Sequence, residues 1–298
     1  MPELPDITVY VERLRPRVLD QPLERIRLVT PIFLRTVIPK WQDAQGRKVV
    51  SVSRLAKRIV LSLEGDMHLV IHLMKLGRLK WDDGGKSPGL KLLHATFTFP
   101  TGALSVIEIG PKKRAQLHIF DSTAALEELR PPGLEPLECE LDEFAEALRR
   151  ENHTIKRSLT DQRIVAGIGN AYSDEILHAA RVSPIALTSK LSDEEIARIY
   201  DAMRRQLEHW TASLRAEVGE RFPEKVTAFR EGMAVHGRFK QPCPVCGTPV
   251  ERIVYADRET NYCARCQTDG KRLADRALSR LLGQDWPKTL EELEERRR

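Results

Sequence analysis

The sequence predicts a multidomain α+β protein with an N-terminal β-sandwich, a mainly helical second domain and a C-terminal module built around four cysteines. Three observations support this prediction. Short β-rich runs separated by turn signals extend to residue 120, helical periodicity follows a Pro- and Gly-rich segment at 130–138, and two Cys-x-x-Cys pairs come near the end. A chain of 298 residues is also longer than one core usually serves.

Composition indicates a globular protein of the cell interior. Hydrophobic residues make up 41% of the chain, which is enough for packed cores. No apolar run approaches the roughly 18 residues of a membrane span, and the N-terminus lacks a signal-peptide pattern. We therefore expect a cytoplasmic protein without a membrane partner, whose five cysteines are metal ligands or free thiols. The net charge of +5 permits a polyanion partner without requiring one.

The first three residues can carry chemistry. Removal of Met1 would leave Pro2 as a free secondary amine with the Glu3 carboxylate beside it. An α-amino group titrates at roughly pH 8, so part of it is uncharged near neutral pH and can attack an electrophilic carbon to form an iminium. Glu3 could then move protons around that carbon. An ordinary Pro-rich terminus is the alternative that these residues alone leave open.

The rest of the first domain, placed at residues 1–129, is one helix followed by strands. Apolar residues from Ile7 to Val18 recur at helical spacing, so the reactive terminus would begin an amphipathic helix. Turn signals such as Asp83-Gly84-Gly85 separate the β-rich runs, which favours an antiparallel sandwich or barrel. The expected strands are 26–29, 49–52, 59–63, 69–73, 92–99 and 104–109.

A linker at 130–138 leads to a helical domain at 139–235. Helical periodicity covers 142–150, 170–180 and 192–214, and the last of these begins with Ser192 and Glu195 at capping-box spacing. The run 164–170 ends in Gly-Ile-Gly-Asn and begins a helix. Glycines and a free helix N-terminus can together seat a phosphate, but tight helix packing explains the same residues equally well.

The zinc-finger module is placed at residues 236–270. Its four cysteines have the spacing of two knuckles around one tetrahedral structural Zn²⁺, with no position left for water. They are Cys243, Cys246, Cys263 and Cys266. Between them, 250–255 and 259–262 predict a hairpin with Arg258 near its tip, where it would be a phosphate ligand or a solvated charge. In the extension 271–298 we expect two helices and favour a packed or frayed tail over a partner-binding element.

Together these motifs resemble the formamidopyrimidine-DNA glycosylase and endonuclease VIII family of base-excision repair enzymes. The resemblance covers about residues 1–268 and implies a β-sandwich, a helix-two-turn-helix domain and a zinc finger. The motifs that carry it are Pro2-Glu3-Leu4-Pro5, Ala56-Lys57, Ile71-His72-Leu73, Gly133-Leu-Glu-Pro-Leu137, Ile155-Lys156, Val165-Ala-Gly-Ile-Gly-Asn170 and the cysteine module with Arg258.

The resemblance implies a bifunctional DNA glycosylase with AP lyase activity, acting as a monomer on double-stranded DNA with damaged bases or abasic sites. Pro2 would attack C1′ and form a Schiff base, Glu3 would shuttle protons, and Lys57 would contact a phosphate and assist catalysis. Elimination at the β and δ positions would then cleave the strand. Base chemistry at C1′ requires a flipped nucleotide.

The implied DNA contacts include a phosphate clamp formed by Asn170 and Arg258. The full set of implied contacts is His94, Lys112, Arg114, Lys156, Asn170 and Arg258. The implied cofactor is one structural Zn²⁺.

Three positions depart from the family pattern. Asp6 replaces a usual Glu, which we expect to be tolerated. Lys75 stands where a methionine normally fills the gap left by the flipped base, and Arg114 replaces a wedge phenylalanine. A duplex gap is best filled by apolar or flat side chains. Oxidised purines, oxidised pyrimidines and abasic sites therefore all remain open as substrates, and a non-catalytic binder of damaged or kinked DNA is the alternative function.

Overall fold

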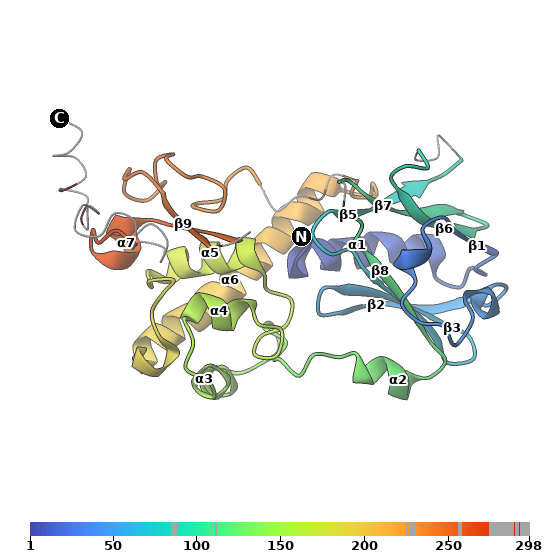
Figure 1. Cartoon of the computed structure of the whole chain (residues 1–298), viewed down its shortest axis with the longest axis horizontal. Coiled ribbons are helices and arrows are strands. Elements are labelled where there is room, and N and C mark those ends of the chain that lie inside the picture. Colours follow the sequence, from blue (N-terminus) through green and yellow to red (C-terminus); the bar gives the residue numbers. More distant parts are fainter. Residues whose placement is uncertain are drawn as a thin grey trace. The chain divides into compact units, whose positions relative to one another are not determined.

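The computed structural model describes residues 1–84, 89–110, 112–224, 226, 230–255, 258–273, 289 and 292, with Tyr255 and Arg258 described by their backbone alone. The chain divides into two compact units (Figure 1). Unit 1 comprises residues 1–131 and 208–228, and unit 2 comprises 132–207 and 229–298. The segment 139–235, predicted as one domain, is therefore divided between the two units.

Unit 1 is built on two four-stranded antiparallel sheets, which confirms the predicted sandwich. One sheet has the order β2 (Val49–Leu55), β3 (Arg58–Leu63), β4 (Met67–His72), β8 (Gln116–Phe120). The other has the order β1 (Arg25–Leu28), β6 (Leu93–Phe99), β7 (Gly102–Glu108), β5 (Gly77–Asp82). Strands β5 and β8 were not among those expected. Both strands are short, and every second side chain lies in the core, between charged residues in β5 and between Gln116, His118 and Phe120 in β8.

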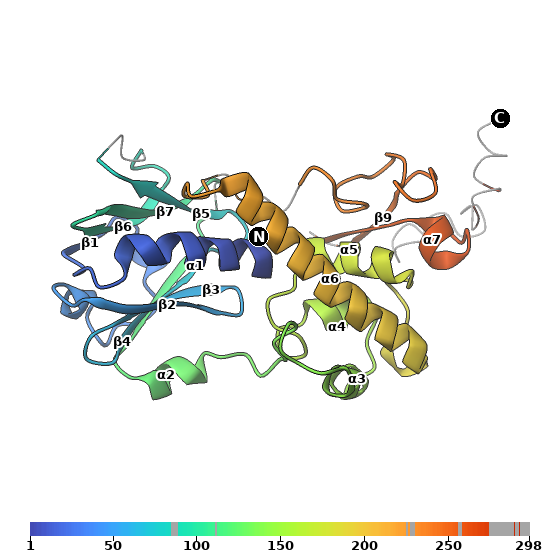
Figure 2. The same cartoon turned by 180° about the vertical axis from the view of Figure 1, so that it is seen from behind.

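Helix α1 (Leu4–Val18) shares the core of the sandwich. Its buried face contributes Ile7, Tyr10, Leu14 and Val18 to one apolar cluster with residues of both sheets. In Figure 2, α1 runs between the sheets. The predicted amphipathic helix is therefore confirmed, and its N-terminal end is fixed by the packing of the whole unit.

The outer face of the β2–β3–β4–β8 sheet has a smaller core of its own. Leu55, Val60 and Val70 pack there against Leu126 of α2 (Thr123–Glu128). The Ser122 side chain caps α2 by accepting the Ala125 N–H at 3.3 Å. This helix, which was not predicted, covers only part of the sheet.

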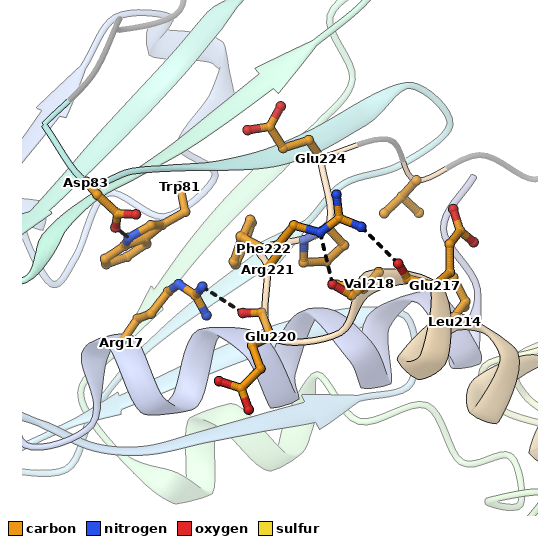
Figure 3. Close-up of a pocket in the computed structure, with 12 residues that line it drawn as sticks. Arg17, Trp81, Asp83, Leu214, Glu217, Val218, Glu220, Arg221, Phe222 and Glu224 are labelled. Carbon is orange, nitrogen blue, oxygen red and sulfur yellow. Dashed lines mark hydrogen bonds between the residues drawn. The ribbon is translucent and has the colours of Figure 1, made fainter.

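Helix α6 (Asp193–Val218) runs from unit 2 into unit 1. Residues 219–224 after it return to the sandwich, where Phe222 lies 5.7 Å from Tyr10 and 6.4 Å from Trp81 between ring centroids. The Arg17 guanidinium lies over the Phe222 ring and donates to the Glu220 carbonyl (Figure 3). These residues line a pocket of about 710 Å³. The segment that follows α6 is thus tied to α1 and β5.

Unit 2 confirms the helical domain and the predicted hairpin. Its elements are α3 (Leu141–Arg149), α4 (Ile155–Thr160), α5 (Asn170–Ala180), the first part of α6, β9 (Glu251–Tyr255), β10 (Arg258–Tyr262) and α7 (Ala264–Thr268). Ser192 and Glu195 form the expected capping box, with reciprocal hydrogen bonds of 3.0 and 3.2 Å. Helix α4, two turns and α5 follow one another, which is a helix-two-turn-helix arrangement.

Two further expectations concern membrane-spanning helices and the C-terminal extension. Among the described residues, no helix has the length and apolar character to cross a membrane. The helices expected in the extension 271–298 lie outside the described residues, apart from 271–273, 289 and 292.

Candidate active site and nucleic-acid interface

The N-terminal residues form the buried start of α1. Glu3 is the N-cap residue and is 2% exposed, and Pro2 is also buried. The Asp6 carboxylate accepts the Glu3 N–H at 2.7 Å. The shorter side chain at position 6 therefore reaches the backbone of the terminus. A reactive terminus here is mounted on a rigid element, which limits the positions that an attacking nitrogen can sample.

Lys57 lies beside this terminus in the turn between β2 and β3. The preceding residue, Ala56, has a φ of 52°, in the left-handed region, and the Lys57 side chain is only 6% exposed. Burial lowers the pKa of Lys57 to about 8, although the Glu3 carboxylate opposes that shift. Burial also lowers the pKa of the Met1 amine. The nearby carboxylates of Glu3 and Asp6 raise that pKa, and Arg78 and Lys57 lower it. The structure thus gathers the N-terminus, Glu3 and Lys57 in one site.

Two loops at the same end of the sheet carry exposed cations. Lys57 precedes β3, Lys75 follows β4, and Lys112 and Arg114 precede β8. Because β3 pairs antiparallel with β4, and β4 with β8, these positions meet at one sheet end. The side chains of Lys75, Lys112 and Arg114 are all exposed there. Two of the three positions that depart from the family pattern, Lys75 and Arg114, therefore have side chains outside the packed core.

A buried carboxylate shapes the second of these loops. Glu108 is 1% exposed, and its Oε2 accepts the N–H groups of Arg114 at 2.7 Å and Ala115 at 3.1 Å. The same oxygen lies 2.8 Å from His94 Nε2. Sequence analysis missed Glu108 because an acidic residue that ends a strand gives no motif. The position of the Arg114 backbone depends on it.

His94, an implied DNA contact, is buried in the structure. Its side chain is 0% exposed, bonded to Glu108 and stacked on Phe33 with 5.0 Å between ring centroids. The imidazole is enclosed in the described structure, and the DNA contact implied for His94 stays a prediction. The histidine supports the loop that carries Arg114.

In unit 2, Lys156 is held by the start of α5. Its Nζ donates to the Asn170 carbonyl at 3.2 Å, to Ser173 Oγ at 3.0 Å and to the Asp174 carboxylate. An ammonium group has three donors, and all three have acceptors here. This geometry supports a role in positioning α5, and the contact with DNA implied for Lys156 stays a prediction.

The glycine turn and the hairpin, two weak signals in the sequence, meet at Asn170. Gly167 has a φ of 82°, Gly169 is the N-cap residue of α5, and Asn170 is its first residue. The Asn170 side-chain amide donates to the Glu259 carbonyl in β10 at 2.7 Å. Arg258 precedes Glu259 at the start of that strand, and its side chain lies outside the described residues.

The four predicted metal ligands come together. Their Sγ atoms all lie within 4.8 Å of one another. The Cys243 and Cys266 sulfurs are 4.0 Å apart and those of Cys246 and Cys263 are 3.4 Å apart. Four thiolates at about 2.3 Å from zinc would be separated by about 3.8 Å, so the set fits one tetrahedral Zn²⁺. The cluster also shares a small core with Val235 and Val250.

Helix α5 anchors the zinc module through residues that the sequence did not reveal. The buried Glu175 accepts the backbone N–H groups of residues 234, 235 and 236 at 2.7 to 2.9 Å. His178 Nε2 lies 3.3 Å from Cys243 Sγ. Such contacts orient the ligands of a metal and the loop that leads to it. In the sequence, Glu175 and His178 cannot be told from ordinary helix residues, because their partners lie in a distant segment.

The protein combines a two-sheet unit with a buried N-terminus, a helix-two-turn-helix domain and a four-cysteine zinc finger. These parts place it in the class of zinc-finger proteins with a helix-two-turn-helix domain. Family models agree. The formamidopyrimidine-DNA glycosylase N-terminal domain matches residues 1–115, its H2TH domain matches 132–215, and the zinc finger found in FPG and IleRS matches 240–268. The chain belongs to the formamidopyrimidine-DNA glycosylase family, and its cysteines form the site of one structural zinc ion.

Known relatives extend over most of the chain. A formamidopyrimidine-DNA glycosylase of Thermus thermophilus is 33% identical over 91% of this chain and 100% of its own length. An uncharacterized formamidopyrimidine-DNA glycosylase-like protein of Mycobacterium tuberculosis is 43% identical over 51% of this chain and 95% of its own length.

Solved structures show the same fold. The Thermus thermophilus MutM (FPG) protein has a TM-score of 0.74 at 31% identity and covers 89% of this chain and 98% of its own. A Lactococcus lactis FPG mutant in complex with a Fapy-dG containing DNA has a TM-score of 0.78 at 25% identity, covering 90% of this chain and 100% of its own. The wild-type Lactococcus lactis protein with an oxidized pyrimidine containing DNA has a TM-score of 0.77 at 25% identity, with the same coverage.

Proposed function

We propose that this protein is a base-excision-repair DNA glycosylase with AP lyase activity, in which Pro2 is the nucleophile. The observation that carries the proposal is the gathering of the N-terminus, Glu3 and Lys57 at the start of α1. Homologues named as formamidopyrimidine-DNA glycosylases, and family structures solved with damaged DNA, support the substrate class.

The proposed reaction uses the chain's own groups at each step. The uncharged Pro2 nitrogen, exposed once Met1 is removed, attacks C1′ of a flipped nucleotide, and the bond from C1′ to the base breaks with its electron pair leaving on the base. Glu3 takes the proton that the Pro2 nitrogen loses after attack and delivers it to the sugar ring oxygen as the ring opens and the iminium forms. Loss of the 2′ proton with departure of the 3′ phosphate is β elimination, and loss of the 4′ proton with departure of the 5′ phosphate is δ elimination. Lys57 would hold a phosphate of the same nucleotide.

The test is borohydride trapping on duplexes with an abasic site, an oxidised guanine or an oxidised pyrimidine. We expect a covalent adduct, because hydride reduces an iminium to a stable amine. Pro2→Gly and Glu3→Gln should each lower strand cleavage. Intact mass must first establish that Met1 is absent, because a blocked Pro2 has no free amine.

Two outcomes would contradict the proposal. Equal cleavage by the parent and both variants would remove the mechanism. DNA binding without an adduct on any of the three duplexes, from protein that lacks Met1, would favour the non-catalytic binder.

A further inference from the structure

One cationic cluster in unit 1 is not used by the proposed reaction. Arg58 is the first residue of β3 and pairs with His72 of β4, and His118 of β8 pairs with Val70. Paired residues and residues two apart point to the same face of a sheet. Since Val60 and Val70 belong to the outer core under α2, Arg58, His72 and His118 also lie on the outer face.

This part of the sheet face carries positive side chains without an acidic partner among the described residues. The pKa of His118 is lowered by burial and then by Arg58 and Arg35. The pKa of His72 is lowered to about 3 by burial and then by Arg58, Lys57 and His118. Among the ion pairs of the described residues, none involves Arg58 or Arg35. Both histidines are therefore neutral near pH 7, and the positive charge here belongs to Arg58, Arg35 and Lys57. These charges repel one another unless an anion joins them.

The internal bonds of Arg58 do not account for its position. A guanidinium carries five N–H donors. Among the described residues, Arg58 has one hydrogen bond, a 3.5 Å contact from its Nη1 to the Leu129 carbonyl, and its Nε is enclosed without a partner. Burial also lowers the pKa of Arg58, since desolvation disfavours the charge. The single bond to the Leu129 carbonyl does not explain why His72, His118 and Arg35 also lie near Arg58.

The location of the cluster indicates its ligand. Arg58 follows Lys57 directly and lies at the sheet end that also carries Lys75, Lys112 and Arg114. Arg35 joins from the side, because its N–H donates to the Leu117 carbonyl of β8 at 2.8 Å. A nucleic-acid strand that reaches Lys57 therefore has further phosphates available to this face, and arginine binds phosphate through two parallel hydrogen bonds.

We propose that Arg58 and His118, flanked by Arg35, form an additional seat for a backbone phosphate of the bound DNA strand, on the outer face of the β2–β3–β4–β8 sheet. The seat rests on the proposed function, because it takes a phosphate of the same DNA. It adds affinity that is independent of base identity, since phosphate contacts position a duplex and do not read it.

The test is the salt dependence of binding to a duplex with a stable abasic-site analogue, measured by fluorescence anisotropy. Arg58→Gln should flatten the slope of log K against log salt by about one unit. It should also weaken binding about tenfold at moderate salt. Arg58→Lys keeps the charge and should keep most of the slope. Lys48→Gln is the matched control, because Lys48 is exposed at the opposite end of the same sheet.

Several results would overturn the inference. One is an unchanged slope and affinity for Arg58→Gln with an unchanged thermal midpoint. Another is a thermal midpoint raised by inorganic phosphate in the parent and not in Arg58→Gln, while the DNA slope stays the same, because the seat would then take a free anion. Equal losses in Arg58→Gln and Arg58→Lys would assign Arg58 to the Leu129 contact. A parent protein that binds no duplex would remove the proposed function itself.

Discussion

The side-chain amide of Asn170 donates a 2.7 Å hydrogen bond to the main-chain carbonyl of Glu259, the residue that follows Arg258 in β10. One bond thus joins the first residue of α5 to the zinc hairpin. The proposed phosphate clamp is therefore a coupled unit, in which the amide fixes the strand that carries the arginine.

This coupling predicts that the losses of DNA-binding free energy caused by substitutions at Asn170 and Arg258 are not additive. Arg258→Ala should flatten the salt slope of DNA binding by about one unit, and Asn170→Ala should weaken binding by about 1 kcal/mol. If the Asn170 bond positions Arg258, the double variant should lose at least about 0.5 kcal/mol less than the sum. Anisotropy titrations of the parent, both single variants and the double variant measure this. Strictly additive losses would contradict the coupling.

The lowered pKa of Lys57 predicts a decline of activity in mildly alkaline solution. A lysine with a pKa of about 8 in the free enzyme is charged below that pH and loses its charge above it. Because a neutral amine binds phosphate poorly, kcat/KM on abasic duplex should fall as pH rises through about 8. A bound phosphate favours the charged form, so single-turnover rates at saturating DNA should hold to higher pH.

Lys57→Arg provides the control for this assignment. Arginine stays charged to pH 12 and beyond, so the alkaline decline of kcat/KM should disappear even if the overall rate is lower. The same decline in the parent and in Lys57→Arg would assign it to another group.

Removal of zinc should unfold the zinc module of unit 2 and leave unit 1 folded. A structural zinc site supplies folding free energy to its own module, and the cysteine cluster packs with Val235 and Val250 in unit 2. We expect chelation to abolish DNA binding while amide signals of the β-sandwich persist in NMR spectra, and added zinc to restore binding.

Cysteine variants test which thiols hold the metal. Cys263→Ser should lower the zinc content below one ion per chain, and Cys139→Ala should leave it unchanged because Cys139 lies outside the cluster. Concerted loss of the sandwich signals on chelation would contradict the independence of the units.

Restoring the usual side chains at two exposed positions should alter base excision. Lys75 and Arg114 are exposed, so Lys75→Met and Arg114→Phe should change the free energy of unfolding by less than about 0.5 kcal/mol. An apolar wedge fills the gap left by a flipped base better than a charge does. The double variant should therefore excise oxidised purines faster than the parent. Cleavage at an abasic site, which has no base to extrude, is the control and should be unchanged. A gain on both substrates would point to general tightening of binding.

Sequence patterns succeeded where the signal is local. Helical spacing located α1, α3, α5 and α6 to within a few residues, and cysteine spacing located the metal site. Local patterns failed for β5 and β8, because each strand places only two or three side chains in the core, and without β8 the position of His118 was not expected. The DNA contact that the resemblance implies for His94 stays a prediction, and its buried contact with Glu108, 14 residues away, has no local sequence signal.

By itself, the sequence determined the sandwich, the helical domain and the zinc ligands. These follow from periodicity, spacing and residue chemistry, which act over a few residues. Only the tertiary structure decided that Lys57 shares a buried site with Glu3, that Asn170 holds the hairpin, and that Arg58 and His118 meet on one sheet face. Those relationships depend on strand register and on desolvation, and both arise only when distant segments pack together.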